Sequence, residues 1–508
     1  MSIRYITTAI PYVNSKPHVG FAMELVEADV MARHWRHRGH DVRFLTGTDD
    51  NSLKNAIAAE AEGIPAEELV ERNAAAFYDL RGPLQISFDD FIRTSADPRH
   101  KAGVERLWRA TAAAGDLYRK HYQGLYCVGC EQFYTESELA DGLCPEHLTA
   151  PQLVNEENWF FKLSRYEDQL RELIESGRLR IEPPGRRNEV LGFIKGGLQD
   201  FSISRSTERA RGWGIEVPDD HDQVIYVWWD ALGNYITALD YSAGGAAYRH
   251  WWTESDVRTH VIGKGIVRFH AVYWPAMLMS AGEQLPTTIF VHDYLTVEGK
   301  KLGKSLGNAI DPVAIVDQFG ADSLRWWLVR EVPRTGDADF TVERLVNRYH
   351  EDLSNGLGNL VNRTVSMIHK YREGLEPQLP DELPDGPLAD VISTVASAVD
   401  AALDNFDFRR ATGALWAVVD EANRFVVEVS PWNLAKAAKA GDADADVKLG
   451  HSLAVLLHAI RVVADELVPF LPDAAERVSA QVRAVDGRLP APQPLFPRIE
   501  ESTLLVSQ

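Results

Sequence analysis

The sequence predicts an α/β protein built on a doubly wound parallel sheet, with an inserted module in the middle and an all-helical part towards the C-terminus. Three observations predict this fold. Residues 5–45 alternate strand, helix and strand patterns, all three cysteines fall within residues 116–205, and the pattern is helical from about Arg344 onward. A chain of 508 residues is long enough for several domains.

The N-terminal stretch has the pattern of a βαβ unit. Residues 5–9 are expected to form a short strand, 11–17 a loop, 18–38 a helix and 42–45 a second buried strand. Apolar residues recur at helical spacing within the predicted helix, and Gly39 follows as a stop signal. Strand, helix and strand in this order are the building block of a parallel, doubly wound sheet.

The sheet pattern is interrupted by the cysteine-containing segment and then resumes. The later strand candidates are residues 224–227, 260–262 and 288–291, with a helical pattern at 266–281. These patterns divide the chain into five segments: the two halves of the sheet domain at 1–115 and 206–305, the inserted module at 116–205, a linking segment at 306–350 and a helical domain at 351–508.

The composition is that of an acidic globular protein. Hydrophobic residues make up 45% of the chain, charged residues make up 25%, and the formal net charge is −21. This charge argues against general electrostatic binding of nucleic acid, because phosphate contacts need positive potential. The N-terminus lacks a basic segment followed by an apolar run, and three cysteines are too few for a disulfide framework. We therefore expect a cytoplasmic protein without a membrane segment.

Two motifs far apart in the chain indicate a phosphate-binding site. The first, PYVNSKPHVGF at residues 11–21, opens the predicted first helix, where backbone N–H groups and the helix dipole favour a phosphate. His18 can add a hydrogen bond there, and Gly20 allows a ligand to approach the backbone. The second, GKKLGKS at residues 299–305, offers two lysines that can clamp a triphosphate as pyrophosphate leaves. Taken singly, the first motif is more typical of a helix cap or surface residue, and the second of a solvated turn.

The cysteines form a metal-ligand pattern. Cys127 and Cys130 are followed, after thirteen residues, by Cys144 and His147. Two such knuckles can deliver four ligands to one tetrahedral Zn²⁺, and a small, turn-rich module gains stability from such an ion. Four protein ligands leave no open position, so we expect a structural zinc; free thiols are the alternative.

In combination, the two phosphate motifs resemble the signatures of the class I aminoacyl-tRNA synthetases, usually written HIGH and KMSKS; here they are HVGF and KLGKS. Four further blocks resemble the methionyl enzymes of that class: FLTGTDD (44–50), RRNEVLGFIKGGLQDFSISR (186–205), VIYVWWDALGNYITAL (224–239) and VIGKGIVRFHAVYWPAMLMSAG (261–282). The resemblance covers nearly the whole chain. It implies a Rossmann-like catalytic domain, an inserted connective module with a zinc knuckle, and an all-α anticodon-binding domain.

The resemblance also implies which residues handle ATP. The catalytic residues that would stabilise the α-phosphate transition state are His18, Lys301 and Lys304. The implied ATP-binding positions are His18, Gly20, Glu24, Lys301, Lys304 and Ser305. ATP would enter with Mg²⁺, and the zinc ligands would be Cys127, Cys130, Cys144 and His147.

The methionine and tRNA sites follow from the same resemblance. Asp49 would pair with the substrate ammonium group, since a desolvated cation must be paired. The implied side-chain pocket consists of Ile10, Tyr12, Trp228, Ala231, Leu232, Tyr235, Ile266, His270 and Trp274. The Tyr235 hydroxyl and the His270 imidazole could both donate to the thioether sulfur. Asn359, Arg363 and Trp432 match the residues that read the anticodon by hydrogen bonding and stacking.

Several positions depart from the family pattern. Phe21 replaces the second histidine of HIGH, and Gly265 replaces the acidic residue that normally follows Gly-Lys. The run after Asp49 reads Asp50-Asn51-Ser52, and Gly303 replaces the serine inside KMSKS. Removing one donor aimed at transition-state charge lowers a rate by on the order of 10²–10³. We therefore expect adenylation to be slow or differently arranged.

The sequence supports one main hypothesis and two alternatives. The main hypothesis is a monomeric methionine–tRNA ligase that uses L-methionine, ATP and tRNA(Met). The alternatives are a specialised paralogue that activates methionine or an analogue for a non-translational or resistance role, and a catalytically silent tRNA-binding protein. The retained His18, Lys301, Lys304, Asp49 and Glu24 favour an enzyme over the silent protein.

Overall fold

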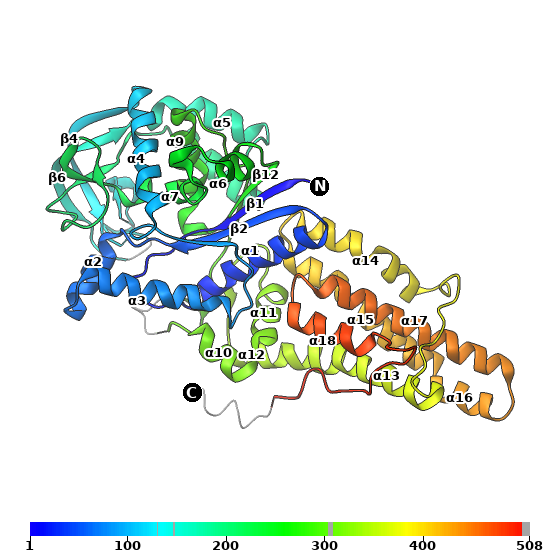
Figure 1. Ribbon diagram of the computed structural model, residues 1–508. Helices are drawn as coiled ribbons and strands as arrows, with labels where there is room; N and C mark the ends of the chain where they lie inside the picture. The colour runs from blue at the N-terminus through cyan, green and yellow to red at the C-terminus, as the bar shows by residue number, and fades with distance from the viewer. Residues whose placement is uncertain (130, 146–147, 303–307, 500–508) are drawn as a thin grey trace. The chain divides into compact units, whose positions relative to one another are not determined.

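The computed structural model describes residues 1–129, 131–145, 148–302 and 308–499 (Figure 1). The chain forms two compact units, Met1–Gly82 with Ile86–Tyr294, and Pro83–Gln85 with Leu295–Gln508. The predicted catalytic segment ended at residue 305, whereas the second unit begins at Leu295.

The first unit is centred on a six-stranded parallel sheet. The strand order is β3-β2-β1-β12-β13-β7, and every pair of neighbours is parallel. The strands are β1 (Ile3–Thr8), β2 (Asp41–Thr48), β3 (Asp90–Arg93), β7 (Arg180–Glu182), β12 (Val257–Gly263) and β13 (Thr288–His292). The predicted strands at 5–9, 42–45, 260–262 and 288–291 are confirmed. Their apolar runs reflect burial on both faces, which parallel sheets require.

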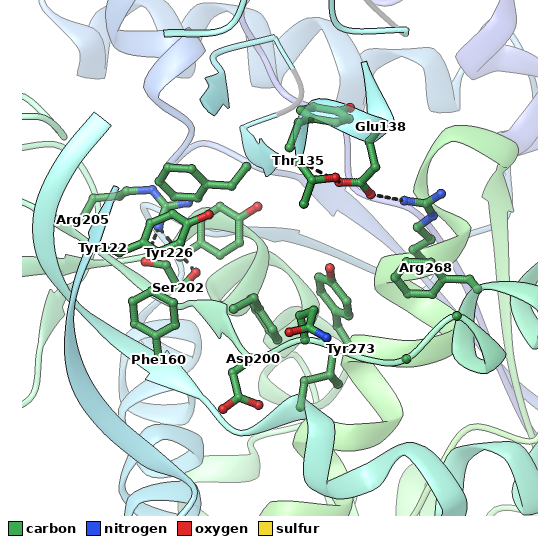
Figure 2. Close-up of a pocket in the computed structure, with 18 of the residues that line it drawn as sticks. Tyr122, Thr135, Glu138, Phe160, Asp200, Ser202, Arg205, Tyr226, Arg268 and Tyr273 are labelled. Carbon is green, nitrogen blue, oxygen red and sulfur yellow. Dashed lines mark hydrogen bonds and ion pairs between the residues drawn. The ribbon is translucent and has the colours of Figure 1, made fainter. Parts of the chain in front are cut away.

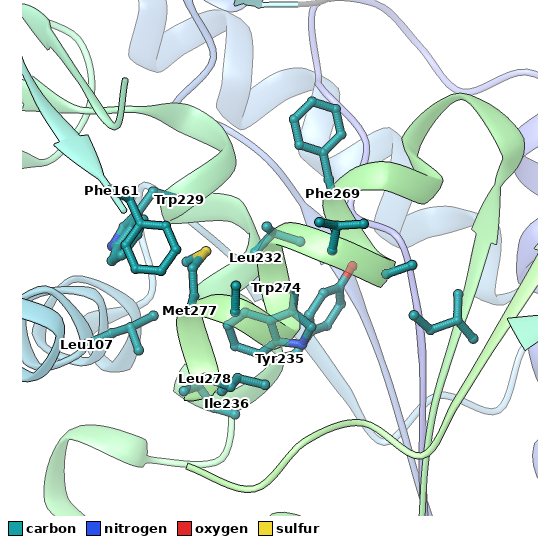
Figure 3. Packing of buried hydrophobic residues seen from close by; sticks show 14 of the residues in the cluster. Leu107, Phe161, Trp229, Leu232, Tyr235, Ile236, Phe269, Trp274, Met277 and Leu278 are labelled. Carbon is teal, nitrogen blue, oxygen red and sulfur yellow. The ribbon is translucent and has the colours of Figure 1, made fainter. Parts of the chain in front are cut away.

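Helices cover the sheet and supply most of the core. They are α1 (Val19–His37), α2 (Leu53–Glu62), α3 (Ala66–Tyr78), α4 (Pro98–Ala113), α5 (Glu167–Glu175), α6 (Pro184–Lys195), α7 (Val227–Thr237), α8 (Ala246–Tyr248) and α9 (Trp274–Ala281). Figure 3 shows Trp229 and Leu232 of α7 packed near Trp274 and Met277 of α9, all of them buried. The predicted helix at 266–281 is confirmed only in part, because a 3₁₀ turn (Lys264–Ile266) and a π-helical turn, η7 (Phe269–Tyr273), precede α9.

The inserted module is built on a four-stranded antiparallel sheet in the order β5-β4-β6-β8. Its strands are β4 (Leu117–Cys127), β5 (Gln132–Tyr134), β6 (Gln152–Phe161) and β8 (Phe201–Ser202). The prediction of one continuous module at 116–205 is wrong in one respect. Strand β7 lies within that range but pairs in parallel with β13, because its buried Ile181 completes the edge of the main sheet.

The strand predicted at 224–227 ends earlier than expected and does not join the main sheet. Strand β11 (Asp220–Ile225) pairs antiparallel with β9 (Ser204–Ser206) and β10 (Glu216–Val217) in a separate small sheet, and Val227 already begins α7. A short apolar run does not itself indicate which sheet it joins.

The second unit is mostly helical. It contains one small sheet, formed by β14 (Leu295–Val297), β15 (Lys300–Lys301) and β16 (Ala338–Asp339). Its helices are α10 (Pro312–Phe319), α11 (Ala321–Arg330), α12 (Val342–Arg348), η9 (Tyr349–Gly358), α13 (Asn359–Arg372), α14 (Pro387–Leu403), α15 (Phe408–Val429), α16 (Pro431–Lys439), α17 (Ala443–Leu467) and α18 (Pro472–Val482). Buried Arg325 of α11 donates to the carbonyls of Leu84 and Phe470, each at 2.8 Å, which fastens residues 83–85 to this unit. Among the described helices, α17 alone is long and apolar enough to cross a membrane, but 61% of its apolar window is buried, as in a core helix.

Candidate active site

The first phosphate motif lies where the sequence placed it, at the start of α1. His18 is the N-cap residue, with extended backbone (φ −125°, ψ 170°), and its Nδ1 accepts a 3.1 Å hydrogen bond from the Gly20 amide. Because Nδ1 is an acceptor, the neutral ring carries its proton on Nε2. His18 can therefore donate a hydrogen bond to a phosphate oxygen at the positive end of the helix.

Glu24, one of the implied ATP-binding residues, is buried and ties α1 to two strands. Its Oε1 accepts the Ala9 amide at 2.9 Å, and its Oε2 lies 2.9 Å from Nε2 of His292, at the end of β13. Burial disfavours the charged form of His292, but the hydrogen bond to Glu24 and the charges of Glu27 and Glu24 outweigh it and raise the pKa of His292 to about 9. The pair therefore fixes the end of β1 that leads into the Ile10–Tyr12 segment.

Phe21 points into an apolar cluster. Its ring lies 5.0 Å from that of Phe77 on α3, at 64°, and the buried members of the cluster include Val13, Val70 and Ala74. The residue that replaces the second histidine of the motif is thus held by packing against α3.

Asp49 lies in a buried acidic cluster at the end of β2. Its backbone pairs with that of Tyr12, and its amide donates to the Pro11 carbonyl at 2.8 Å. Burial, followed by the charges of Asp230, Glu131 and Asp50, raises the pKa of Asp49 well above its usual value. Such a cluster favours a cation, and the ammonium group of an amino acid is one that would fit it.

Asn51 connects this cluster to α7. Its side-chain amide donates to Asp230 at 2.7 Å, and its backbone N–H donates to Asp49 at 3.2 Å. Asp230 in turn bonds to buried His100. Asn51 departs from the family run, yet it orients the carboxylate that the resemblance assigns to the ammonium group.

The aromatic pocket is assembled by α7, η7 and α9. Tyr235 and His270 are each 1% exposed, and the Tyr235 hydroxyl lies 2.6 Å from Nε2 of His270. His270 Nδ1 lies 3.0 Å from the Ile266 carbonyl, so Nδ1 carries the proton and Nε2 accepts from Tyr235. Burial lowers the pKa of His270 to about 4, so the ring is neutral. The expectation that Tyr235 and His270 both donate to the thioether sulfur is therefore revised. In this arrangement Nε2 of His270 accepts the Tyr235 proton and has none to donate.

Most of the remaining residues implied for the pocket belong to one hydrophobic core. Leu232 and Trp274 are buried in it, and the partly buried Ile10, Tyr12, Trp228 and Ile266 pack against it. Ala231 is also buried. Trp228 stacks on Phe269, with ring centroids 3.9 Å apart and planes at 7°. Phe269 was missed by the sequence analysis, although it directly precedes His270.

Only part of the second phosphate motif is described. Lys301 lies in β15, in register with Thr296 of β14. Gly303, Lys304 and Ser305 lie outside the described residues.

Two of the four implied zinc ligands can be placed. Cys127 ends β4, and Cys144 lies in the segment between β5 and β6; both are buried, in one small cluster with Tyr134 and Leu139. The Cys144 thiol lies 3.6 Å from the Tyr134 hydroxyl. Cys130 and His147 lie outside the described residues, and the two placed thiols fit a soft metal ion.

The implied anticodon readers lie in the second unit. Asn359 begins α13 and is exposed, and Arg363 follows one turn later on the same helix. Trp432 is 44% exposed at the start of α16, after the long α15. Asn423 of α15 donates to the Gly356 carbonyl at 3.4 Å, just before α13. An indole left this exposed is available for stacking.

Comparisons with known proteins show the family to which the chain belongs. The family model described as class I tRNA synthetases (M) matches residues 4–152 and 147–365, and the anticodon binding domain of methionyl tRNA ligase matches 384–496. A methionine–tRNA ligase of Brucella suis biovar 1 is 43% identical over 525 residues and covers 98% of each chain.

Solved structures give the same result. Methionyl-tRNA synthetase of Mycobacterium tuberculosis bound by methionyl-adenylate is 38% identical, with a TM-score of 0.91 over 97% of this chain and 100% of that one. The apo form of the same enzyme is 36% identical, with a TM-score of 0.85 over 98% and 99% of the two chains. This chain therefore belongs to the methionyl-tRNA synthetases, within the class I tRNA synthetases.

Proposed function

We propose that the chain activates L-methionine with MgATP, releasing pyrophosphate, and transfers the methionyl group to the 3′ end of tRNA(Met). The observation that carries this proposal is the meeting of Asp49 and the Tyr235–His270 pocket in one unit. A buried carboxylate in the same unit as a cluster of aromatic side chains suits a ligand with an ammonium group at one end and an apolar, polarizable side chain at the other.

The ATP side rests on different residues. His18 would donate from Nε2 to the α-phosphate, at the N-terminus of α1. Lys301 and Lys304 would stabilise the charge that develops on pyrophosphate, as the resemblance of GKKLGKS implies. Mg²⁺ would arrive with ATP as part of the substrate.

The tRNA side rests on the second unit. Trp432 would stack on an anticodon base, while Asn359 and Arg363 would hydrogen-bond to base edges. We also propose that the protein is a monomer. The three-cysteine composition supports a cytoplasmic location.

We also propose a structural Zn²⁺ held by Cys127, Cys130, Cys144 and His147. Its support is the pair of buried thiols in one small cluster. Elemental analysis of protein purified without chelators should find one equivalent of zinc, and Cys127→Ser should loosen the module. Metal-free protein with an intact module would refute the zinc site and leave the proposed ligase activity standing.

Phe21 and Gly265 favour a second candidate, a specialised ligase for methionine or an analogue. The two candidates differ in substrate range. Pyrophosphate exchange measured with methionine and with thioether analogues separates them, because an ordinary ligase should prefer methionine and a specialised one an analogue.

A further inference from the structure

His260 packs against the residues implied for the methionine pocket and is not one of them. It belongs to β12, between Thr259 and Val261, and is 0% exposed. Burial lowers the pKa of His260 well below its usual value, so the ring is neutral. A buried imidazole needs a partner for each of its two nitrogens, because a hydrogen bond left unmade is costly in the interior.

Both nitrogens of His260 have a partner, and the partners set the tautomer. The indole N–H of Trp274 lies 3.2 Å from Nε2 of His260, and an indole can only donate, so Nε2 is an acceptor. Nδ1 therefore carries the proton of the neutral ring and donates it to Oγ1 of Thr7, 2.8 Å away. Thr7 and His260 are paired residues of the neighbouring strands β1 and β12, so the central sheet fixes the imidazole.

The His260 ring also supports a second residue implied for the pocket. The ring centroids of Tyr235 and His260 are 4.2 Å apart, with planes at 36°. Tyr235 is held on its backbone as well, because the Tyr5 hydroxyl donates to the Tyr235 carbonyl at 2.9 Å. The rings of Tyr235 and Trp274 have centroids 6.0 Å apart, and Figure 3 shows them close together. One imidazole thus contacts two of the aromatic side chains that are implied to bind methionine.

The segment that carries Trp274 presents its rings in different directions. Tyr273, at the end of η7, lines a separate hollow of about 590 Å³, shown in Figure 2, and stacks on Phe201 at 4.3 Å. The next residue, Trp274, is fully buried and faces Tyr235. An indole has a single polar atom, so its one hydrogen bond, to His260, is what fixes the ring about its own axis.

We propose that His260 is a positioning residue for the methionine pocket, which holds the Trp274 indole through Nε2 and supports the Tyr235 ring, and so sets the length of side chain that the pocket accepts. His260 acts through these two residues and does not itself contact the ligand. The inference rests on the proposed function and adds a residue that determines its specificity. An apolar pocket distinguishes one methylene by roughly 10–200-fold, and it can do so only when its walls are held in place.

Two amide variants separate the hydrogen bond from packing. The amide of His260→Gln reaches the position of Nε2 and can accept from Trp274, whereas the shorter His260→Asn ends near the position of Nδ1 and can bond only to Thr7. His260→Asn should raise the KM for methionine roughly tenfold, the effect of one buried donor left without a partner, while kcat stays within about twofold. His260→Gln should keep both constants within about threefold of wild type, because the acceptor is retained.

Ethionine, which is one methylene longer than methionine, gives the specificity readout. In pyrophosphate exchange, His260→Asn should lower the preference for methionine over ethionine roughly tenfold, and His260→Gln should retain the preference. Thr259→Val is the matched control and should leave the preference unchanged. Thr259 is a buried neighbour on the same strand, its side chain points to the opposite face of the sheet, and its hydroxyl has no hydrogen-bond partner among the described residues.

Equal losses in His260→Gln and His260→Asn would show that His260 acts by packing alone, and unchanged preference in both would show that its hydrogen bond does not shape the pocket. Either result overturns the inference. Should His260→Asn fail to fold, Thr7→Val takes its place, because it keeps the side-chain shape and removes the acceptor of Nδ1. It should lower the preference at least about threefold, and an unchanged preference overturns the inference.

Calorimetric binding of methionine and ethionine makes the same comparison without catalysis. A wild-type protein without pyrophosphate exchange would therefore count against the proposed ligase activity, while the binding preferences of the variants still decide the role of His260.

Discussion

The Tyr235 hydroxyl donates a 2.6 Å hydrogen bond to Nε2 of His270, which is oriented by its own Nδ1 donation to the Ile266 carbonyl. This chain of two bonds sets the tautomer of a buried, neutral histidine at the centre of the aromatic pocket. A substrate thioether would therefore meet a hydroxyl whose proton is shared with His270, and not two independent donors.

Tyr235→Phe tests this arrangement. The change leaves Nε2 of His270 buried without a partner, a loss of about 1–3 kcal/mol. The KM for methionine should rise roughly tenfold, with a smaller rise for norleucine, which has no sulfur to accept a hydrogen bond. Pyrophosphate exchange with both amino acids measures the ratio. Tyr248→Phe, which removes a hydroxyl that bonds to Glu283 away from the pocket, is the control. Equal losses for the two substrates would show that the hydroxyl does not act on sulfur.

The Glu24–His292 pair predicts how stability depends on pH. The pKa of His292 is raised to about 9 from its ordinary value of 6.5, so the folded state holds a proton that the unfolded state releases. The resulting stability is fully present below pH 6.5 and is lost as pH rises through 9. It amounts to at most roughly 3 kcal/mol, since one pKa unit is about 1.4 kcal/mol. Burial also raises the pKa of Glu27 from 4.5 to about 7. The protonated Glu27 therefore contributes stability below pH 4.5, and this contribution is lost as the pH rises to 7.

Denaturant unfolding of wild type and His292→Gln from pH 6 to pH 10 measures this effect. The difference in unfolding free energy between the two proteins should shrink as pH rises. A difference that stays constant across the range would mean that His292 does not hold a proton in the folded state.

The residues Phe21 and Gly265, which depart from the family pattern, predict that adenylate formation is slow. Phe21→His should reduce stability by about 1 kcal/mol, because a polar ring replaces an apolar one against Phe77. Phe21→His with Gly265→Asp should raise the rate of adenylate formation by more than the two single changes combined, because groups that act on one transition state are coupled. Single-turnover measurements on wild type, both single variants and the double variant decide. Four equal rates would show that the departures are neutral.

Trp432→Ala tests the anticodon assignment. The indole is 44% exposed, so its removal should change stability little. Charging of tRNA(Met) should fall by about 1–3 kcal/mol in kcat/KM, the usual value of one stacked base, while activation of methionine stays unchanged. Val427→Ala, on the neighbouring helix α15 and 62% exposed, serves as the control. An equal fall in activation and charging would make Trp432 a packing residue.

The central sheet could be predicted because most of its strands carry a short apolar run and because α1 is bounded by clear signals at His18 and Gly39. Strand β7 could not, because three residues pair with a strand more than a hundred positions later and carry no local periodicity. Long-range pairing of this kind is decided by tertiary packing, as it is for β11.

The candidate active site was likewise predictable only in part. The residue types of Asp49, Tyr235 and Trp432 could be recognised in their motifs. The directions of hydrogen bonds could not, and these make His270 an acceptor and Glu24 a partner of His292. Nor does sequence show that Asn51 bridges Asp49 and Asp230, because that contact joins elements 179 positions apart.

The most direct test of the whole account is methionine-dependent ATP–pyrophosphate exchange by purified protein, followed by charging of tRNA(Met). We expect exchange with methionine, at least tenfold weaker exchange with leucine or isoleucine, and transfer of the activated methionine to the tRNA. Protein that binds tRNA(Met) but shows no exchange with methionine would contradict the account and identify the chain as a silent tRNA-binding member of its family.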